Sequence, residues 1–233
     1  TDVFWYRNYV AISRANFALK LLNNISEKEM PNKKIRIAEM RFLRGHMHFI
    51  QKIVFKMVPY IDESMSPEDI ANTSNVALTN DELWQKIDDD FQFAYDNLPE
   101  TQSEVGRSNK YAAAAYLAKV YLYKAYRQDE MHNVVSIDKG DMQKVIDLTG
   151  IVINSPYRLE NDFAYNFLPG SYENGQESLF AVQYSKDDGT TYGRLNMSNA
   201  LTTPTPGGDF NKPSQNLVNA FKTNNGLPMF DTY

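Results

Sequence analysis

The sequence predicts a mostly α-helical protein, in which helical hairpins are followed by an irregular, loop-rich segment with short strands. Two observations lead to this prediction. Over the first 155 residues, apolar side chains recur every three or four positions, which is the period of an amphipathic helix. After Ser155 this period fades, and Gly, Pro, Asn, Asp and Tyr become frequent. We therefore expect a helical region at residues 1–155 and an irregular region at residues 156–233.

The first two helices are expected at about Val3–Ile25 and Asn32–Met57. In both segments, apolar residues at helical spacing form one face that a neighbouring helix can cover. Pro31 suits the start of the second helix, because proline is tolerated where a helix begins. Pro59 ends the second helix, because the residue before a proline avoids helical geometry.

The third helix is expected to begin after Thr79 or Asn80, since either side chain can cap the first backbone amides. Asp81 and Glu82 then lie in the first turn, where negative charge complements the helix dipole. Pro99 ends this helix.

The fourth and fifth helices are expected at about Asn109–Arg127 and Lys139–Ile153. The fourth contains the run YAAAAYLAKVYLYKAY, whose small residues allow a neighbouring helix to approach closely. Connectors of short to moderate length favour antiparallel packing of successive helices. The pattern therefore indicates helical hairpins of the tetratricopeptide type, although the sequence fixes no repeat period.

The irregular region contains two candidate elements. The stretch ESLFAVQYS, Glu177–Ser185, alternates as a strand does. The stretch SQNLVNAFKTNNG, Ser214–Gly226, is interpreted as a short helix closed by its glycine. A long loop with the sequence Thr-Pro-Thr-Pro lies between them and favours extended backbone.

Composition excludes several classes of function. The net charge is −5 and no large basic block exists, so nucleic acid is not an expected partner. Cysteine is absent, which excludes disulfides, thiolate chemistry and cysteine-based zinc sites. No apolar run reaches the length of a membrane-spanning helix. No phosphate-binding loop, dinucleotide fingerprint or nucleophile elbow is present, so we assign no catalytic residue and no cofactor.

His46 and His48 are the first candidates for metal ligands. Residues two apart on a helix point in different directions, whereas a helical zinc pair needs a spacing of four. We therefore expect packing or partial exposure for these histidines and predict no metal site. A loose calcium site in the irregular region stays an alternative.

Charged residues within the helices have structural interpretations. The run Asp88–Asp90 is expected to form a solvated surface, because three successive helical residues fan across different faces. Arg41 and Arg44 lie in an otherwise apolar helix. They are expected to pair with acids on the neighbouring helix or to extend past the core to solvent.

Aromatic residues in the irregular region indicate a ligand-binding surface. A sugar ring has an apolar face that stacks on an aromatic ring, and hydroxyls that bind Asn, Asp or Arg. The alternative is that these rings only hold the long loops together. The residues that we predict to bind ligand are Tyr165, Tyr172, Tyr184, Tyr192, Arg194 and Asn196.

Six blocks of the sequence, taken in order, resemble the SusD/RagB family of outer-membrane lipoproteins. They are WYRNYVAISRANFAL, AEMRFLRGHMHFIQKIVFKMVPYIDE, LWQKIDDDFQFAYDNLP, GRSNKYAAAAYLAKVYLYKA, ESLFAVQYS and KPSQNLVNAFKTNNGLPMFD. Together the blocks cover most of the chain. His46 and His48 depart from the residues that the family commonly has there, and no ligand residue of the family carries over to a numbered position.

The resemblance implies a non-enzymatic protein that captures oligosaccharides at the cell surface and delivers them to a SusC-like TonB-dependent transporter of the outer membrane. It implies that residues 156–233 face the ligand and continue into a C-terminal part beyond this sequence. The membrane attachment that it implies is a lipid anchor N-terminal to this sequence. Alternatives are a RagB-like peptide-binding protein, a helical-repeat scaffold that binds only protein, and a glycosidase.

Overall fold

The computed structural model describes residues 2–168, 170–183, 215, 223–225 and 227–228. The chain forms two compact units, residues 1–182 and 183–233, which we describe separately. The first unit contains α1 (Asp2–Asn24), α2 (Lys33–Phe55), α3 (Pro67–Asn72), α4 (Asn80–Asn97), α5 (Lys110–Ala125), β1 (Tyr126–Gln128), β2 (Val134–Ile137), α6 (Lys139–Ile153), and the 3-10 helices η1 (Phe163–Phe167) and η2 (Gly170–Tyr172). The described part of the second unit contains β3 (Thr223–Asn224) and β4 (Leu227–Pro228).

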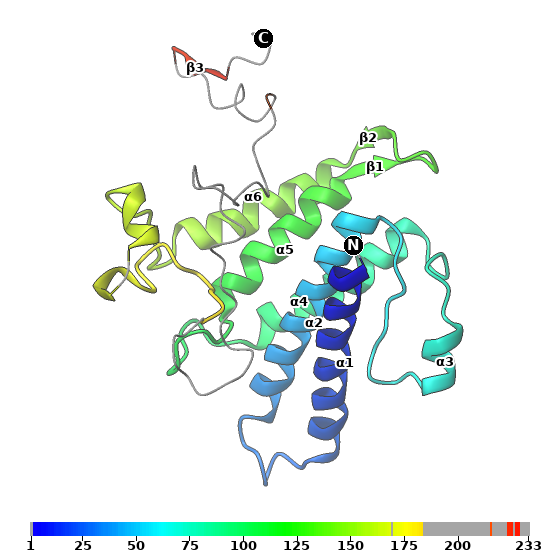
Figure 1. The fold of residues 1–233 in the computed structure, drawn as a ribbon. Helices are drawn as coiled ribbons and strands as arrows, with labels where there is room; N and C mark the ends of the chain where they lie inside the picture. Colours follow the sequence, from blue (N-terminus) through cyan, green and yellow to red (C-terminus); the bar gives the residue numbers. More distant parts are fainter. Residues whose placement is uncertain (1, 169, 184–214, 216–222, 226, 229–233) are drawn as a thin grey trace, which may run out of the picture. The chain divides into compact units, whose positions relative to one another are not determined.

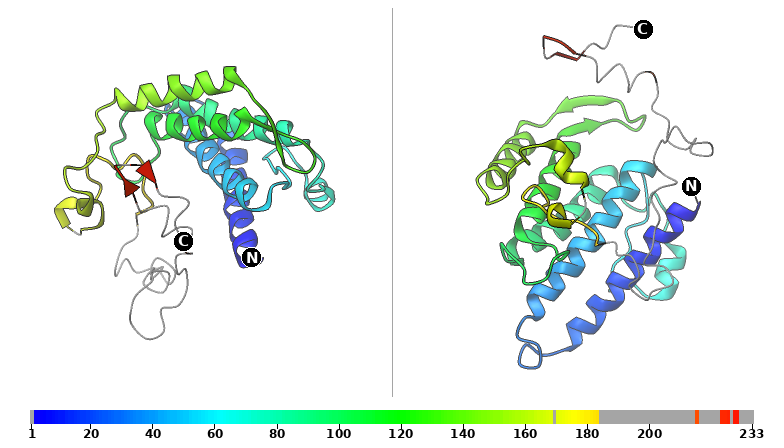
Figure 2. Two further views of the ribbon diagram at one scale, coloured as in Figure 1. Left: turned by 90° about the horizontal axis from the view of Figure 1, so that it is seen from above. Right: turned by 60° about the vertical axis from the view of Figure 1, so that its left-hand side comes forward.

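The long helices of the first unit pack in chain order. Helix α1 contacts α2, α2 contacts α4, α4 contacts α5, and α5 contacts α6. Figure 1 shows α1 and α2 as an antiparallel pair, and the views in Figure 2 show α5 and α6 lying side by side. The predicted helical hairpins are therefore confirmed. Within the described ranges, no helix combines the length and hydropathy that crossing a bilayer requires.

All five predicted helices are present, and their ends lie within two residues of the expected bounds. Local capping explains their starts. The Thr79 hydroxyl accepts from the Glu82 amide while the Glu82 carboxylate accepts from the Thr79 amide, so a capping box begins α4. Asn109 and Asp138 cap α5 and α6 through their side chains, each of which accepts from the amide three residues on.

Short elements in the first unit differ from the prediction. The fourth helix ends at Ala125 rather than Arg127, because the chain turns into the antiparallel ribbon β1–β2. In Figure 1 this ribbon projects beyond the ends of α5 and α6. The predicted strand at residues 177–185 is wrong over its described part, because residues 177–183 form no strand. The ring of Phe180 packs edge-on against Phe42 at 5.1 Å, which holds this segment against the helices.

The predicted helix at residues 214–226 does not reach its expected end. Thr223 and Asn224 form β3, which pairs with β4. Asn225 adopts the left-handed conformation (φ 51°) before Gly226, and an Asn-Gly pair favours a two-residue hairpin turn. Most of the predicted helix lies outside the described residues. The division of the chain at residue 155 stays a prediction.

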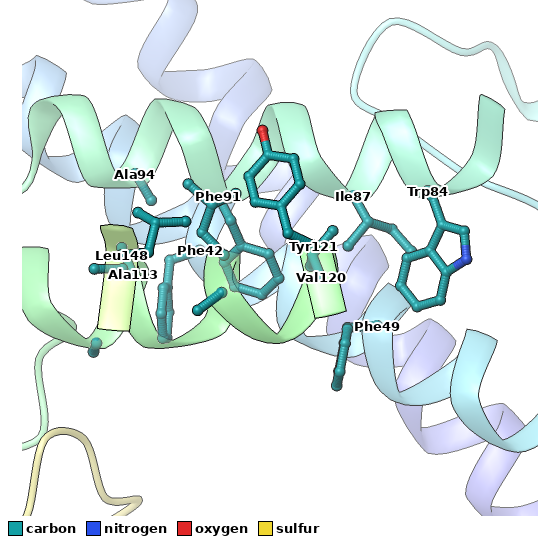
Figure 3. Close-up of a cluster of buried hydrophobic side chains, with 14 of the residues drawn as sticks. Phe42, Phe49, Trp84, Ile87, Phe91, Ala94, Ala113, Val120, Tyr121 and Leu148 are labelled. Atoms are coloured by element: carbon teal, nitrogen blue, oxygen red, sulfur yellow. The ribbon is translucent and has the colours of Figure 1, made fainter. Parts of the chain in front are cut away.

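The core lies where α2, α4 and α5 meet (Figure 3). Phe42 from α2 packs edge-on against Phe91 from α4, with ring centroids 5.6 Å apart. Ala113 and Ala114 are fully buried on α5, which confirms that the alanine run serves close helix packing. Burial of this apolar area is the main stabilising contribution to the fold.

The close approach of α2 and α4 generates a prediction about glycine. A β-carbon at Gly45 would lie 3.1 Å from Asp90 Cβ and 3.3 Å from the Phe91 ring. We expect Gly45→Val to lower the free energy of unfolding by about 2 kcal/mol through overpacking. Gly150→Ala on α6 is the control, because nothing lies within 4 Å of the added carbon. It should raise stability by up to about 1 kcal/mol. Equal effects of the two substitutions in urea unfolding would contradict the tight α2–α4 contact.

Candidate functional site

Two of the predicted ligand residues lie next to each other. Tyr165 is in η1 and Tyr172 ends η2, and their ring centroids are 4.5 Å apart with planes tilted by 36°. Tyr172 is 39% exposed, whereas Tyr165 is partly covered. The other predicted residues, Tyr184, Tyr192, Arg194 and Asn196, lie outside the described residues.

The most exposed rings of this segment are Phe163 and Phe167, which our predicted set omitted. Their exposed fractions are 76% and 71%, and their centroids lie 5.1 Å apart. The signal in the sequence is FAYNF preceded by Asp162, whose carboxylate accepts from the Ala164 amide and so begins η1. We call the four residues Phe163, Tyr165, Phe167 and Tyr172 the ring surface.

The ring surface is held in place by residues that follow it in the chain. The Glu177 carboxylate accepts from the Glu160 amide and from Asn166 Nδ2, both at 2.9 Å. These hydrogen bonds lower the pKa of Glu177, so it stays ionised. Gln176 Nε2 donates to the Leu159 carbonyl at 3.0 Å, and the Gln176 carbonyl accepts from the Arg158 amide at 3.1 Å. The loop that bears the rings is therefore tied to residues 176–177 at several points.

A polar pocket of about 240 Å³ is lined by the loop before α5, by Tyr157 and by residues from 174 to 181. Its lining residues from 174 to 181 follow Tyr172 in the chain, whereas none of the four residues of the ring surface lines the pocket. Asn109 organises the pocket. Its Nδ2 donates to the Tyr157 hydroxyl at 2.8 Å and to the Leu179 carbonyl at 3.2 Å, while its Oδ1 caps α5.

The loop before α5 is fixed by a buried carboxylate on α2. Glu39 accepts from Arg36 at 2.8 Å, from Gln102 at 3.1 Å and from Arg107 at 3.2 Å. Arg107 Nε also donates to Glu104 at 2.6 Å. The pocket wall is consequently built from polar groups that are already paired within the protein.

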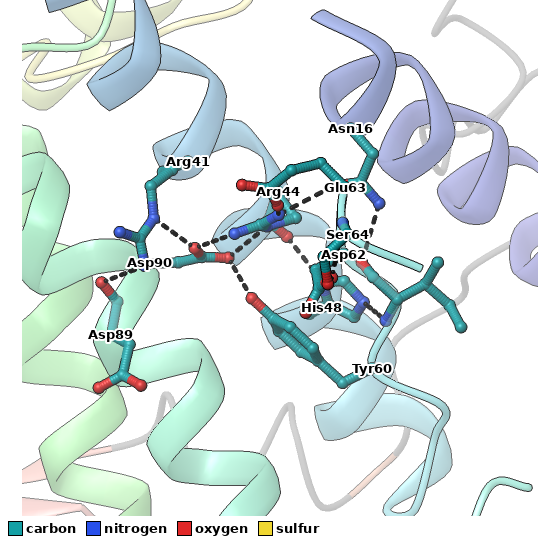
Figure 4. A network of polar contacts seen from close by, with 11 residues as sticks. Asn16, Arg41, Arg44, His48, Tyr60, Asp62, Glu63, Ser64, Asp89 and Asp90 are labelled. Atoms are coloured by element: carbon teal, nitrogen blue, oxygen red, sulfur yellow. Dashed lines mark hydrogen bonds and ion pairs between the residues drawn. The ribbon is translucent and has the colours of Figure 1, made fainter. Parts of the chain in front are cut away.

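The densest cluster of ionisable groups lies elsewhere, inside the helical stack (Figure 4). The Asp90 carboxylate is fully buried and accepts from Arg41 Nε at 2.8 Å, from Arg44 Nε and Nη2 at 2.8 and 2.7 Å, and from the Tyr60 hydroxyl at 2.8 Å. Burial by itself raises the pKa of Asp90, but the two guanidiniums hold it below its usual value. A carboxylate with every lone pair occupied serves structure rather than catalysis.

This cluster confirms one prediction and corrects another. Arg41 and Arg44 do pair with an acid on the neighbouring helix. The prediction that Asp88–Asp90 forms a solvated surface is wrong, because Asp88 and Asp90 are buried and only Asp89 is exposed. The fan of three residues around α4 places two of them toward neighbouring elements, where Lys124 lies 3.5 Å from Asp88.

The same cluster reaches α1 and the loop after α2. Arg44 Nη1 donates to Asn16 Oδ1 at 3.0 Å and pairs with Glu63. Asn16 Nδ2 in turn donates to the Ile61 carbonyl at 2.9 Å. One network therefore joins α1, α2, α4 and residues 60–63.

His48 is also part of this packed interior. Its Nε2 accepts from the Ile61 amide, so the ring proton lies on Nδ1, which donates to the Arg44 carbonyl; both distances are 3.2 Å. Burial lowers the pKa of His48 to about 4. His46 lies edge-on to Tyr116 at 5.0 Å, and burial lowers its pKa to about 4 as well. The prediction that these histidines pack is confirmed. Among the described residues, no three His, Asp or Glu side chains are grouped so as to hold a metal ion.

The fold is thus of the helical-hairpin class, with a loop that bears exposed rings and a pocket lined in part by the residues that follow this loop. The family model SusD-like_3, described as "Starch-binding associating with outer membrane", matches residues 1–122, just over half of the chain. The chain belongs to this SusD-like family.

Known proteins share the same helical region. SusD-like protein P2 of Formosa agariphila is 31% identical over 189 residues, which cover 78% of this chain and 34% of that protein. A SusD-like protein of Bacteroides ovatus is 28% identical over 77% of this chain and 32% of its own length. One similar protein has a crystal structure with a xylogluco-oligosaccharide and is 26% identical in sequence to this chain. The similarity covers 85% of this chain and 38% of that protein, and the TM-score is 0.69. The chain therefore spans about a third of the length of these relatives.

The buried carboxylate generates a prediction about stability. We expect Asp90→Asn to lower the free energy of unfolding by about 3–5 kcal/mol, because the buried guanidinium of Arg44 and the partly buried guanidinium of Arg41 lose the charge that compensates them. The control is Asp89→Asn, one residue earlier and exposed, which should change stability by about 0.5 kcal/mol or less. Chemical unfolding of both variants measures the difference. A loss under about 1 kcal/mol for Asp90→Asn would show that the network is not stabilising.

The buried histidine generates a prediction about pH. The pKa of His48 is about 6.5 when unfolded and about 4 when folded, so the folded state binds fewer protons. Its stabilising contribution is fully present above pH 6.5 and is lost as the pH falls toward 4, by up to about 3 kcal/mol. When the free energy of unfolding is measured from pH 7 to 4, it should fall less steeply with decreasing pH in His48→Gln than in the wild type. Part of the fall should remain, because His46 still contributes to it. Identical slopes for wild type and His48→Gln would contradict the assignment.

Proposed function

We propose that this chain is part of a non-catalytic cell-surface protein that captures oligosaccharides and delivers them to a SusC-like TonB-dependent transporter. Membership of a family described as starch-binding supports the first half of this proposal. The solved relative with a bound xylogluco-oligosaccharide supports it further. The family's association with the outer membrane supports a location at that membrane, with attachment through an N-terminal lipid anchor.

The observation that carries the proposal is the exposure of Phe163 and Phe167 on a loop whose following residues, from 174 to 181, help to line a pocket. Large apolar rings are normally buried, so two adjacent exposed phenyl rings on a braced loop indicate a contact surface. The apolar face of a sugar stacks on such rings, and its hydroxyls pair with polar groups. The proposed ligand residues also include Tyr165, Tyr172 and, from the sequence, Tyr184, Tyr192, Arg194 and Asn196.

Glu104, which lines the pocket, and Glu177, which braces the ring-bearing loop, favour binding over hydrolysis. Glycoside hydrolysis needs one carboxylic acid whose pKa is raised so that it can donate a proton. The pKa of Glu177 is instead lowered by its hydrogen bonds, and Glu104 is paired with Arg107. These two groups are therefore suited to holding structure and not to protonating a leaving group.

Ring removal tests the proposal. We expect the double variant Phe163→Ala/Phe167→Ala to weaken oligosaccharide binding at least tenfold, since each stacked ring contributes about 1 kcal/mol. Isothermal titration with xylogluco-oligosaccharides and other neutral glycans measures the affinity. Phe17→Ala is the control, because this ring is 65% exposed on α1 and should not affect binding.

Three outcomes would contradict the proposal. Release of reducing ends during incubation would show a glycosidase. Binding of peptides but of no glycan would favour the RagB-like alternative. If the chain binds neither glycans nor peptides, and loss of the rings does not change its binding to protein partners, it would be a scaffold.

A further inference from the structure

The pocket of about 240 Å³ is a concave site of its own, since no residue of the ring surface lines it. Pockets for drug-sized ligands measure about 300–1,000 Å³, so this smaller pocket has room for one small ring and not for a chain of sugars. Its lining combines two charged side chains, Glu104 and Arg107, with the apolar parts of Tyr157, Leu179 and Phe180. A pocket of this mixed character suits a ligand that has both an apolar face and polar edges.

Arg107 is fixed in position but keeps one nitrogen available. A tight turn, in which Gly106 adopts a φ of 85°, brings Arg107 back toward Glu104. Arg107 Nε donates to Glu104 Oε2 at 2.6 Å, and Arg107 Nη1 donates to the buried Glu39 at 3.2 Å. Within the residues that the structure describes, neither Arg107 Nη2 nor Glu104 Oε1 makes a hydrogen bond. Both side chains are open to solvent, with exposed fractions of 34% for Arg107 and 64% for Glu104. The pocket therefore offers an available donor next to an available acceptor.

The aromatic side of the pocket is fixed as well. The Tyr157 hydroxyl accepts from Asn109 Nδ2 at 2.8 Å, and its ring packs edge-to-face with Tyr111 at a centroid distance of 5.9 Å. The Phe180 ring is held against Phe42 at 5.1 Å. Rings that are already held need no further ordering when a ligand binds, so they provide a preformed apolar surface for C–H groups.

We propose that the pocket is a second subsite, which binds one pyranose ring through two hydroxyls on neighbouring carbons. One hydroxyl accepts from Arg107 Nη2 and the next donates to Glu104 Oε1, while the C–H groups of the ring contact Tyr157. A pair of vicinal hydroxyls uses both charges of the ion pair, whereas a carboxylate or phosphate uses only the guanidinium. This inference rests on the proposed function, because it assigns a group of the same glycan ligand to the pocket. It restricts the ligand to glycans with a free vicinal pair of hydroxyls.

Deoxy sugars test the requirement for vicinal hydroxyls. Removal of the 3-hydroxyl from a methyl hexopyranoside breaks both vicinal pairs of the ring, whereas removal of the 6-hydroxyl breaks neither. In saturation-transfer NMR titrations with methyl glucoside, galactoside and mannoside, we expect at least one glycoside to bind with millimolar affinity. Its 3-deoxy form should bind about tenfold more weakly, because charged groups are left without partners. Its 6-deoxy form should bind within about twofold of the parent glycoside.

Variants connect the binding to the named groups. Arg107→Gln and Glu104→Ala should each weaken binding of the methyl glycoside and of the oligosaccharide about tenfold. Arg36→Gln is the matched control, because Arg36 donates to the same Glu39 but does not line the pocket, and it should leave both affinities unchanged. Thermal unfolding shows whether each variant is folded. Because Glu104 is 64% exposed, Glu104→Ala tests the pocket even if Arg107→Gln lowers stability.

The outcomes separate this inference from the function beneath it. If Phe163→Ala/Phe167→Ala weakens oligosaccharide binding but folded Glu104→Ala does not, the pocket subsite is overturned and glycan capture at the ring surface stands. Equal weakening by the 3-deoxy and 6-deoxy changes, or binding of no methyl glycoside, would overturn the recognition of vicinal hydroxyls. Absence of any glycan binding by the wild-type chain would overturn the proposed function itself.

Discussion

The helical stack depends on the burial of one carboxylate. Asp90 loses all contact with solvent, and that loss is offset only if its oxygens accept from Arg41, Arg44 and Tyr60 at the same time. Arg41 and Arg44 come from α2, and Tyr60 comes from the loop after it. Their hydrogen bonds to Asp90 therefore fix the position of α2 relative to α4. Asn16 extends the same requirement to α1.

The helical stack supports the candidate site but does not itself form the site. Phe180 anchors the irregular segment on Phe42, and Asn109 links the start of α5 to Tyr157 and Leu179. A buried Glu39 fixes the loop on the pocket's other wall. Rigid helix ends therefore position loops, and the loops present rings and carboxylates to solvent, which is a common division of labour between scaffold and binding surface.

Sequence periodicity was sufficient for the five long helices, because their apolar stripes are long, but the short helix α3 was not predicted. Sequence periodicity did not predict the burial of Asp90. A run of three acids indicates a solvent-exposed surface unless their partners on another helix are known. The ribbon β1–β2 was missed because strands of three and four residues carry too little pattern. At the site, all the rings in our predicted set were tyrosines, and Phe163 and Phe167 were omitted. The exposure of these rings follows from a 3-10 turn that only the backbone reveals.

Phe163 and Phe167 share one further property, which is that neither ring belongs to the buried core. Residues whose replacement leaves folding undisturbed are free to diverge. In this chain the rings that we propose to bind ligand and the side chains that form the helical core thus occupy separate positions. Substitutions in the loop can accordingly accumulate during evolution while the helical framework is retained.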